Sequence, residues 1–212
     1  MSIRKIKFIE GEYYHIYNRG VDKRNIFSNK TDLERFLKSM EGFNTKNPIG
    51  SLYENSFKDL GGKASKLVKF VAYCLNPNHY HFLITPLTEK GVEKFMQRLG
   101  TGYTMYFNEK HHRSGSLFQG KFKSQHINSN EYLLRASAYV NLNNSDANGK
   151  IKNTLSISSW KEYTEPTNLN FCDKSIILGQ FRSPQEYEKF SLEAWENTSE
   201  RKERGKDLEF VK

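Results

Sequence analysis

Three segments of the chain carry the apolar patterns of β-strands. Residues 12–19 (EYYHIYNR) alternate between two faces and are rich in tyrosine. Residues 66–75 form a nearly continuous apolar run, and residues 79–85 (HYHFLIT) form another. The sequence NPN at 76–78 separates these two runs with a strong turn signal. The pattern therefore predicts one strand near the start of the chain and a β-hairpin in its middle.

Between and after these strands, apolar residues recur at the spacing of α-helices. One helix is predicted to begin at the candidate N-cap Thr31 and to end at Gly42. A second covers residues 91–110, where apolar side chains recur every three or four positions. A third is predicted from the candidate N-cap Asn128 to about Asn143.

This order of elements predicts an α+β fold, in which an antiparallel sheet carries helices packed on one face. Residues 44–66 are polar and are expected to form a loop. We predict a domain over residues 10–145 and a C-terminal extension over residues 146–212. The extension holds a connecting piece and a short helix near residues 183–190, and it ends in a highly charged tail.

Composition narrows the class of partner. The chain has 33 Lys and Arg against 24 Asp and Glu, a net charge of +9, which attracts polyanions without naming one. Its 12 Tyr, 15 Phe and 2 Trp suit single-stranded nucleic acid, because bases stack on aromatic rings, although most rings must fill the core. Two cysteines, Cys74 and Cys172, predict neither a disulfide framework nor a zinc knuckle. No signal peptide or membrane span is recognised, so we expect a cytoplasmic protein with no membrane partner.

The sharpest candidate for chemistry is the pair His79 and His81. Alternate residues of a strand share a face, so both imidazoles point the same way while Tyr80, Phe82 and Ile84 point into the core. Their Cα atoms are expected roughly 7 Å apart, which allows both rings to reach one divalent ion. The alternative is a pair of surface histidines beside a turn.

A second candidate lies on the predicted third helix. Tyr132, Ala136, Tyr139 and Asn143 form one stripe, with Tyr139 and Asn143 one turn apart. Such a stripe is usually core, but an asparagine is a poor core residue because its amide needs partners. The alternative reading is a phenol presented to a phosphate, beside an amide oxygen that binds a metal ion.

A third candidate is the segment LFQGKFKSQHI at residues 117–127. Its basic and aromatic side chains interleave around Gly120, which permits a close approach of the backbone. The segment suits the lining of a strand-binding groove. An ordinary exposed loop or edge strand with outward lysines explains it equally well.

Together these motifs resemble one family. The segments YHIYNRG, NPNHYHFLI, MQRLGTGYTMYFN, GSLFQGKFKS and YLLRASAYVNLN occur in the order found in the REP-associated tyrosine transposases, which belong to the single-tyrosine transposases with a His-hydrophobic-His (HUH) motif, the insertion-sequence 200-like group. The resemblance covers about residues 10–145. Five motifs in order are much more specific than any one of them.

The resemblance implies a ferredoxin-like antiparallel sheet with the HUH motif on a central strand. It implies that His79, His81 and Asn143 hold Mg²⁺ or Mn²⁺ and that Tyr139 is the nucleophile. The expected activity is that of a transposase, which cuts and rejoins hairpin-flanked single-stranded DNA through a 5′-phosphotyrosine intermediate. The expected partner is a hairpin of the repetitive extragenic palindrome type, bound by a monomer or homodimer. We expect DNA contacts from His15, Asn18, Arg19, Phe118, Lys121 and Lys123.

The sequence departs from the family at two positions of the third helix. Asn141 stands where histidine is common, and Asn144 where proline is common. Neither position is an expected ligand or nucleophile, so the chemistry is not excluded.

Two other functions fit parts of the pattern. A domesticated relative that binds hairpin DNA or RNA without cutting would need the basic, aromatic surface but not all four chemical residues. A zinc hydrolase would use the two histidines, but the nearby acidic general base of such sites is absent from the motif.

Overall fold

The computed structural model describes residues 7–47, 65–146, 149–167 and 170–203. Most of the polar loop predicted at residues 44–66, and the end of the charged tail, lie outside these ranges. Among the described helices, none is both long and apolar enough to cross a membrane.

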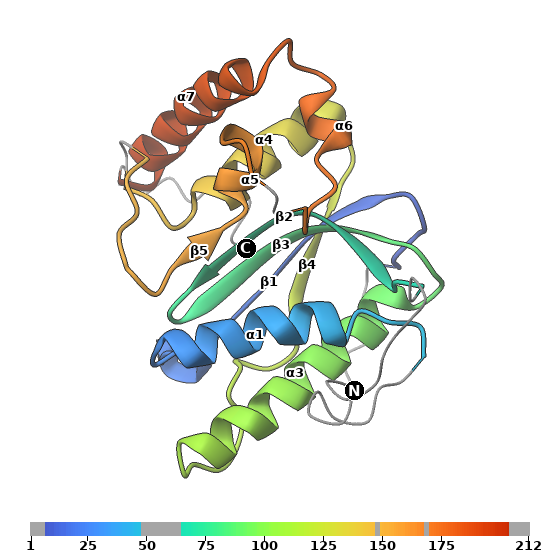
Figure 1. Cartoon of the computed structure of the whole chain (residues 1–212), viewed down its shortest axis with the longest axis vertical. Coiled ribbons are helices and arrows are strands. Elements are labelled where there is room, and N and C mark those ends of the chain that lie inside the picture. Colours follow the sequence, from blue (N-terminus) through green and yellow to red (C-terminus); the bar gives the residue numbers. More distant parts are fainter. Residues whose placement is uncertain (1–6, 48–64, 147–148, 168–169, 204–212) are drawn as a thin grey trace.

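A five-stranded antiparallel sheet forms the middle layer of the molecule, as Figure 1 shows. The strands follow the order β4-β1-β3-β2-β5, so the first four strands have the arrangement of a ferredoxin-like sheet. The predicted α+β fold is confirmed, and the histidine pair lies on the central strand. The strands are β1 (Tyr13–Arg19), β2 (Val68–Asn76), β3 (His79–Pro86), β4 (Lys123–Ile127) and β5 (Ile157–Ser158).

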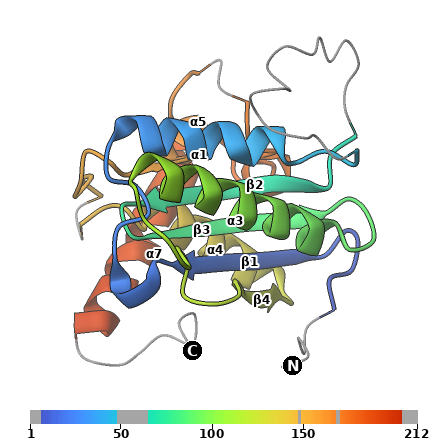
Figure 2. The ribbon, with the colours of Figure 1, turned by 90° about the horizontal axis from the view of Figure 1, so that it is seen from below.

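Helices cover both faces of this sheet, and the expectation of helices on one face was wrong. Helices α1 and α3 pack on one face, whereas α4, α5, α6 and α7 lie over the other (Figures 1 and 2). The described helices are α1 (Lys30–Gly42), α3 (Gly91–Lys110), α4 (Asn130–Leu142), α5 (Trp160–Thr164), α6 (Ser175–Leu178) and α7 (Pro184–Glu203), with a short 3-10 turn η1 (Val21–Lys23).

The two central strands explain why a second helical layer is needed. Every residue of β3 except His79 is buried, and every residue of β2 except Lys69 is buried. Strands covered on both faces read as nearly continuous apolar runs rather than as alternating ones. The runs at residues 66–75 and 79–85 therefore carried the signal for a second layer. That layer comes from α4 and from the C-terminal extension, whose α7 is much longer than the short helix predicted there.

The two N-caps differ from those predicted. The side chain of Asn29, not Thr31, accepts a hydrogen bond from a backbone N–H in the first turn of α1. Likewise Ser129, not Asn128, caps α4 by accepting from the N–H of Tyr132. In each case a second polar residue stands close by, so the sequence leaves the exact boundary open.

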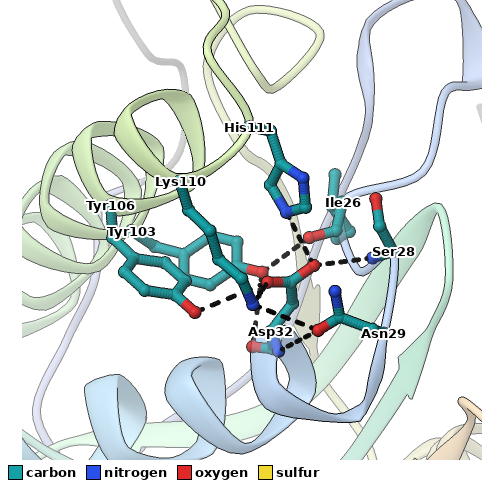
Figure 3. A network of polar contacts seen from close by, with 8 residues as sticks. All are labelled: Ile26, Ser28, Asn29, Asp32, Tyr103, Tyr106, Lys110 and His111. Atoms are coloured by element: carbon teal, nitrogen blue, oxygen red, sulfur yellow. Dashed lines mark hydrogen bonds and ion pairs between the residues drawn. The ribbon is translucent and has the colours of Figure 1, made fainter.

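A buried carboxylate joins α1 to α3 on the face opposite the histidine pair (Figure 3). Asp32 is fully buried and accepts hydrogen bonds from Lys110 Nζ at 2.6 Å, His111 Nε2 at 2.9 Å and the Ser28 N–H at 2.9 Å. Burial raises the pKa of Asp32, but these hydrogen bonds outweigh burial and hold it below its usual value. The carboxylate therefore stays ionised and ties the start of α1 to the end of α3.

Removing this carboxylate is expected to destabilise the fold. Asp32→Ala should lower the free energy of unfolding by about 3 kcal/mol, because Lys110 and His111 lose a buried partner. Glu34→Ala is the matched control, since the Lys30–Glu34 pair on the same helix is exposed and its loss should cost less than about 0.5 kcal/mol. Urea unfolding measures both, and equal losses would contradict the role given to Asp32.

Candidate active site

The register of the sheet gathers polar side chains on the face beneath α4. Residues directly opposite each other on antiparallel strands project from the same face. Tyr17 of β1 lies opposite His81 of β3, and Arg19 lies opposite His79. On the other side of β3, Asn76 of β2 lies opposite His79. The two histidine rings are 5.3 Å apart at their centroids and nearly perpendicular, at 87°.

His79 faces the end of α4. In the tautomer that carries its hydrogen on Nδ1, His79 donates to Asn78 Oδ1 at 2.6 Å. The lone pair is then on Nε2, which lies 3.0 Å from Asn143 Oδ1. A nitrogen lone pair and an amide oxygen thus converge, and this arrangement suits a cation.

His81 is paired with a third histidine that the motif does not contain. His15 Nε2 lies 2.8 Å from His81 Nδ1, and the two rings stack with centroids 5.0 Å apart. His15 was expected to contact DNA, but it is 0% exposed, so that expectation was wrong. Burial lowers the pKa of His15 to about 4, so the ring is neutral at neutral pH. When the shared hydrogen lies on His81, its Nε2 keeps the lone pair that a metal ion requires.

Tyr139 packs edge-on against these rings. Its ring centroid is 5.6 Å from that of His81 and 5.9 Å from that of His15, at angles of 88° and 75°. On its other side lies Trp195 of α7, 6.0 Å away. The side chain is only 6% exposed. Burial raises the pKa of Tyr139 to about 12, and a hydrogen bond with Asn143 opposes this shift.

The geometry of α4 explains why Tyr139 and Asn143 meet. Residues four apart lie one turn apart on the same side of a helix. Asn143 is the C-cap of α4, so its side chain hangs from the end of the helix toward His79. The stripe predicted on this helix thus faces the sheet, and both of its chemical residues reach the histidine pair.

The donor set is compatible with Mg²⁺ or Mn²⁺. Imidazole nitrogens from His79 and His81 would be joined by the Asn143 amide oxygen, and amide oxygens suit these hard ions. Within the described residues, no group of three His, Cys, Asp or Glu side chains is placed to hold a metal ion. The three candidate ligands, two imidazoles and one amide, would all be neutral.

The residues expected to contact DNA separate into exposed and buried ones. Arg19, Lys121 and Lys123 are exposed at the end of β1 and the start of β4. Lys123 lies opposite Tyr17, which puts it on the face of the histidine pair. The expectation fails for Phe118, which is 8% exposed and packs edge-on against Tyr80 in the core.

Asn18 is also placed differently from the expectation. It is buried, and its amide donates to Gly120 O while its oxygen accepts from the N–H of Arg19. Asn18 therefore holds the segment around Gly120 against β1 instead of offering its side chain to DNA. A short motif does not reveal the burial of Asn18 or Phe118, because each contacts a residue far away in sequence, Gly120 and Tyr80 respectively.

The structure adds a second tyrosine, Tyr17, to the face of the histidine pair. Tyr17 stacks on His81 with ring centroids 5.7 Å apart, and burial raises the pKa of its phenol. The alternating pattern of β1 carried this signal, since Tyr17 shares a face with its neighbours at every second position. In contrast, Tyr103 is buried on the other face and donates to Ile26 O, beside Tyr106 and Asp32.

The buried histidine predicts how stability depends on pH. The folded pKa of His15 is about 4 against an ordinary 6.5, so its contribution of about 3 kcal/mol is complete above pH 6.5 and is lost as the pH falls toward 4. His15→Gln cannot titrate at this position, and its unfolding free energy should fall less steeply over that range. Urea unfolding at several pH values tests this, and parallel curves for the two proteins would refute it.

Comparisons with known proteins show the family to which the chain belongs. Among solved structures, the chain is similar to a REP-associated tyrosine transposase bound to a REP hairpin, at 13% identity over 68% of this chain and 72% of that chain, with a TM-score of 0.45. A search of curated proteins finds no match. The family model described as "Transposase IS200 like" matches residues 9–143, well over half of the chain. The protein therefore belongs to the IS200-like transposase family.

Proposed function

We propose that the protein is a metal-dependent tyrosine transposase that cuts and rejoins hairpin-flanked single-stranded DNA. The observation that carries this proposal is the meeting of Tyr139 with His79, His81 and Asn143 on one face of the sheet. Two elements far apart in sequence, β3 and α4, supply these residues, and family membership supports the same reading.

In the proposed reaction, Tyr139 is the nucleophile. Its Oη forms a bond to the phosphorus of a phosphodiester and the bond from phosphorus to the 3′ oxygen breaks. The phenol loses its proton, and the leaving 3′ oxygen takes up a proton to become a hydroxyl. The 5′-phosphotyrosine conserves the energy of the diester, so a 3′ hydroxyl can reverse the step and rejoin the strands. His79, His81 and Asn143 would hold Mg²⁺ or Mn²⁺, which supplies polarisation of the phosphate when bound.

The high pKa of Tyr139 defines what the site has to provide. A phenol with a pKa of about 12 is almost fully protonated at neutral pH and is a weak nucleophile. Positive charge next to the phosphate favours loss of the proton during attack, and a precise position of the ring favours the reaction further. The rings of His15 and His81 and the indole of Trp195 supply that position.

The C-terminal extension supports the nucleophile through α4. Asn141, one of the two departures from the family, is fully buried and donates to the hydroxyl of Tyr187 on α7. Its backbone oxygen and side chain accept from Ser158 and Ser159. Asn141 therefore fastens α4 to the extension and takes no part in metal binding.

The expected DNA path is basic. Arg19 and Lys123 are exposed on the face of the histidine pair, and Lys121 is exposed just before β4. Their cations would meet phosphates of the bound strand. A hairpin of the repetitive extragenic palindrome type, action as a monomer or homodimer, and a place in the cytoplasm all belong to this proposal.

Tyr139→Phe tests the assignment. The variant keeps the ring that packs on His81 and Trp195 but loses the oxygen, so the covalent adduct with a hairpin-bearing single strand should fall roughly 10³-fold or more in Mn²⁺. The measurement is a gel shift that survives denaturation, with thermal melting as a check on folding.

Tyr17→Phe is the matched control, because Tyr17 also touches His81 and its loss should leave adduct formation largely intact. Chelation of the metal should stop adduct formation in the wild type. Tight binding without any adduct, in the wild type and with either ion, would instead identify a hairpin-binding protein that does not cut.

A further inference from the structure

A second asparagine lies at the proposed metal site, at the end of β2. Asn76 is 6% exposed, and its Nδ2 lies 3.1 Å from His79 Nε2 and 3.1 Å from Asn143 Oδ1. Those two atoms are themselves 3.0 Å apart. Three side chains from β2, β3 and the end of α4 thus form a nearly equilateral triangle of polar atoms.

The size of this triangle matches a metal site. Neighbouring ligand atoms of an octahedral ion, each about 2.1 Å from it, are separated by about 3 Å. In the protein alone, the Asn76 amide group donates to the two acceptors and so supplies the positive end that a cation would otherwise supply. The same three positions can face one ion once Asn76 presents its oxygen.

The surroundings of Asn76 allow that change. A side-chain amide exchanges its oxygen and nitrogen by a half-turn about one bond, with almost no change of shape. At its other end, Asn76 Oδ1 accepts from Ser156 Oγ at 2.9 Å, and a hydroxyl can equally accept from an amide N–H. The nearby Cys74 sulfur, 3.6 Å from Nδ2, can pair with either end.

The chemistry of the proposed ligand set favours binding of the metal ion by a further oxygen, that of Asn76. The set of His79, His81 and Asn143 contains no carboxylate, so these three ligands bring no negative charge to the ion. Hard ions such as Mg²⁺ and Mn²⁺ prefer oxygen ligands, of which Asn143 supplies one. We propose that Asn76 is a further ligand of the metal ion, through Oδ1. This inference rests on the proposed function, since that function requires a metal ion at His79 and His81.

A change of metal preference tests direct contact. In Asn76→Cys, a thiolate would replace the amide oxygen, so Mn²⁺ affinity should fall about tenfold and Cd²⁺ affinity should rise at least about tenfold, with a thiolate-to-Cd²⁺ absorption band in the ultraviolet. Both are measured by titration of the full-length protein without DNA. The wild type controls for Cys74, which it also carries.

Asn78→Cys is the matched control, because Asn78 touches the opposite nitrogen of His79 and should gain no Cd²⁺ affinity. The proposal is overturned if Asn76→Cys binds Cd²⁺ no better than Asn78→Cys. Should thermal melting show that Asn76→Cys does not fold, Asn76→Asp decides: tighter Mn²⁺ binding than the wild type supports the ligand, and equal or weaker binding refutes it.

The two proposals fail separately. If the wild type forms the adduct but the Asn76 variants show no change in metal affinity, only the assignment of Asn76 as a ligand is rejected. If those variants change metal affinity but the wild type forms no adduct, the nuclease function is rejected and the assignment of Asn76 as a ligand stands.

Discussion

The pairing of β1 with β3 is the constraint on which the rest of the structure depends. The register that puts Tyr17 opposite His81 sends every second side chain of β3 toward α4 and the others into the core against α1 and α3. Because strand periodicity is two, a slip by one residue would exchange these sets and bury both histidines among aromatic rings. The hydrophobic effect therefore fixes which face of β3 carries the histidine pair, since Tyr80, Phe82 and Ile84 must be buried on the other face.

The histidine face of the sheet also requires that α4 is held in place, because α4 carries Tyr139 and Asn143. The C-terminal extension holds α4 through Asn141 of the helix, which hydrogen-bonds to Ser159 and to Tyr187. The ring of Tyr139 thus lies between two supports, the histidine rings on one side and Trp195 on the other. In this reading, residues that lie outside the family match are part of what positions the chemistry.

Much of this could be predicted from local pattern, and the failures share one cause. Period-two alternation put His79 and His81 on one face, and the four-residue spacing put Tyr139 beside Asn143. The burial of His15, Asn18 and Phe118 could not be foreseen, because α4 and distant loops cover them. The sequence pattern assigns Asn76 only to a turn, because its contact with Asn143 at the end of α4 joins segments far apart in the chain. The apolar runs at residues 66–75 and 79–85 indicated a second helical layer, but only when both were considered together.

The central claim is that the phenol of Tyr139 forms the covalent bond to DNA. Trypsin releases residues 136–150 as one peptide in which Tyr139 is the only tyrosine, whereas Tyr17 falls in the peptide of residues 8–19. Mass spectrometry of the trapped adduct, after nuclease digestion, should therefore find the nucleotide phosphate on the peptide 136–150. Its recovery on the peptide 8–19, or on neither, would contradict the account.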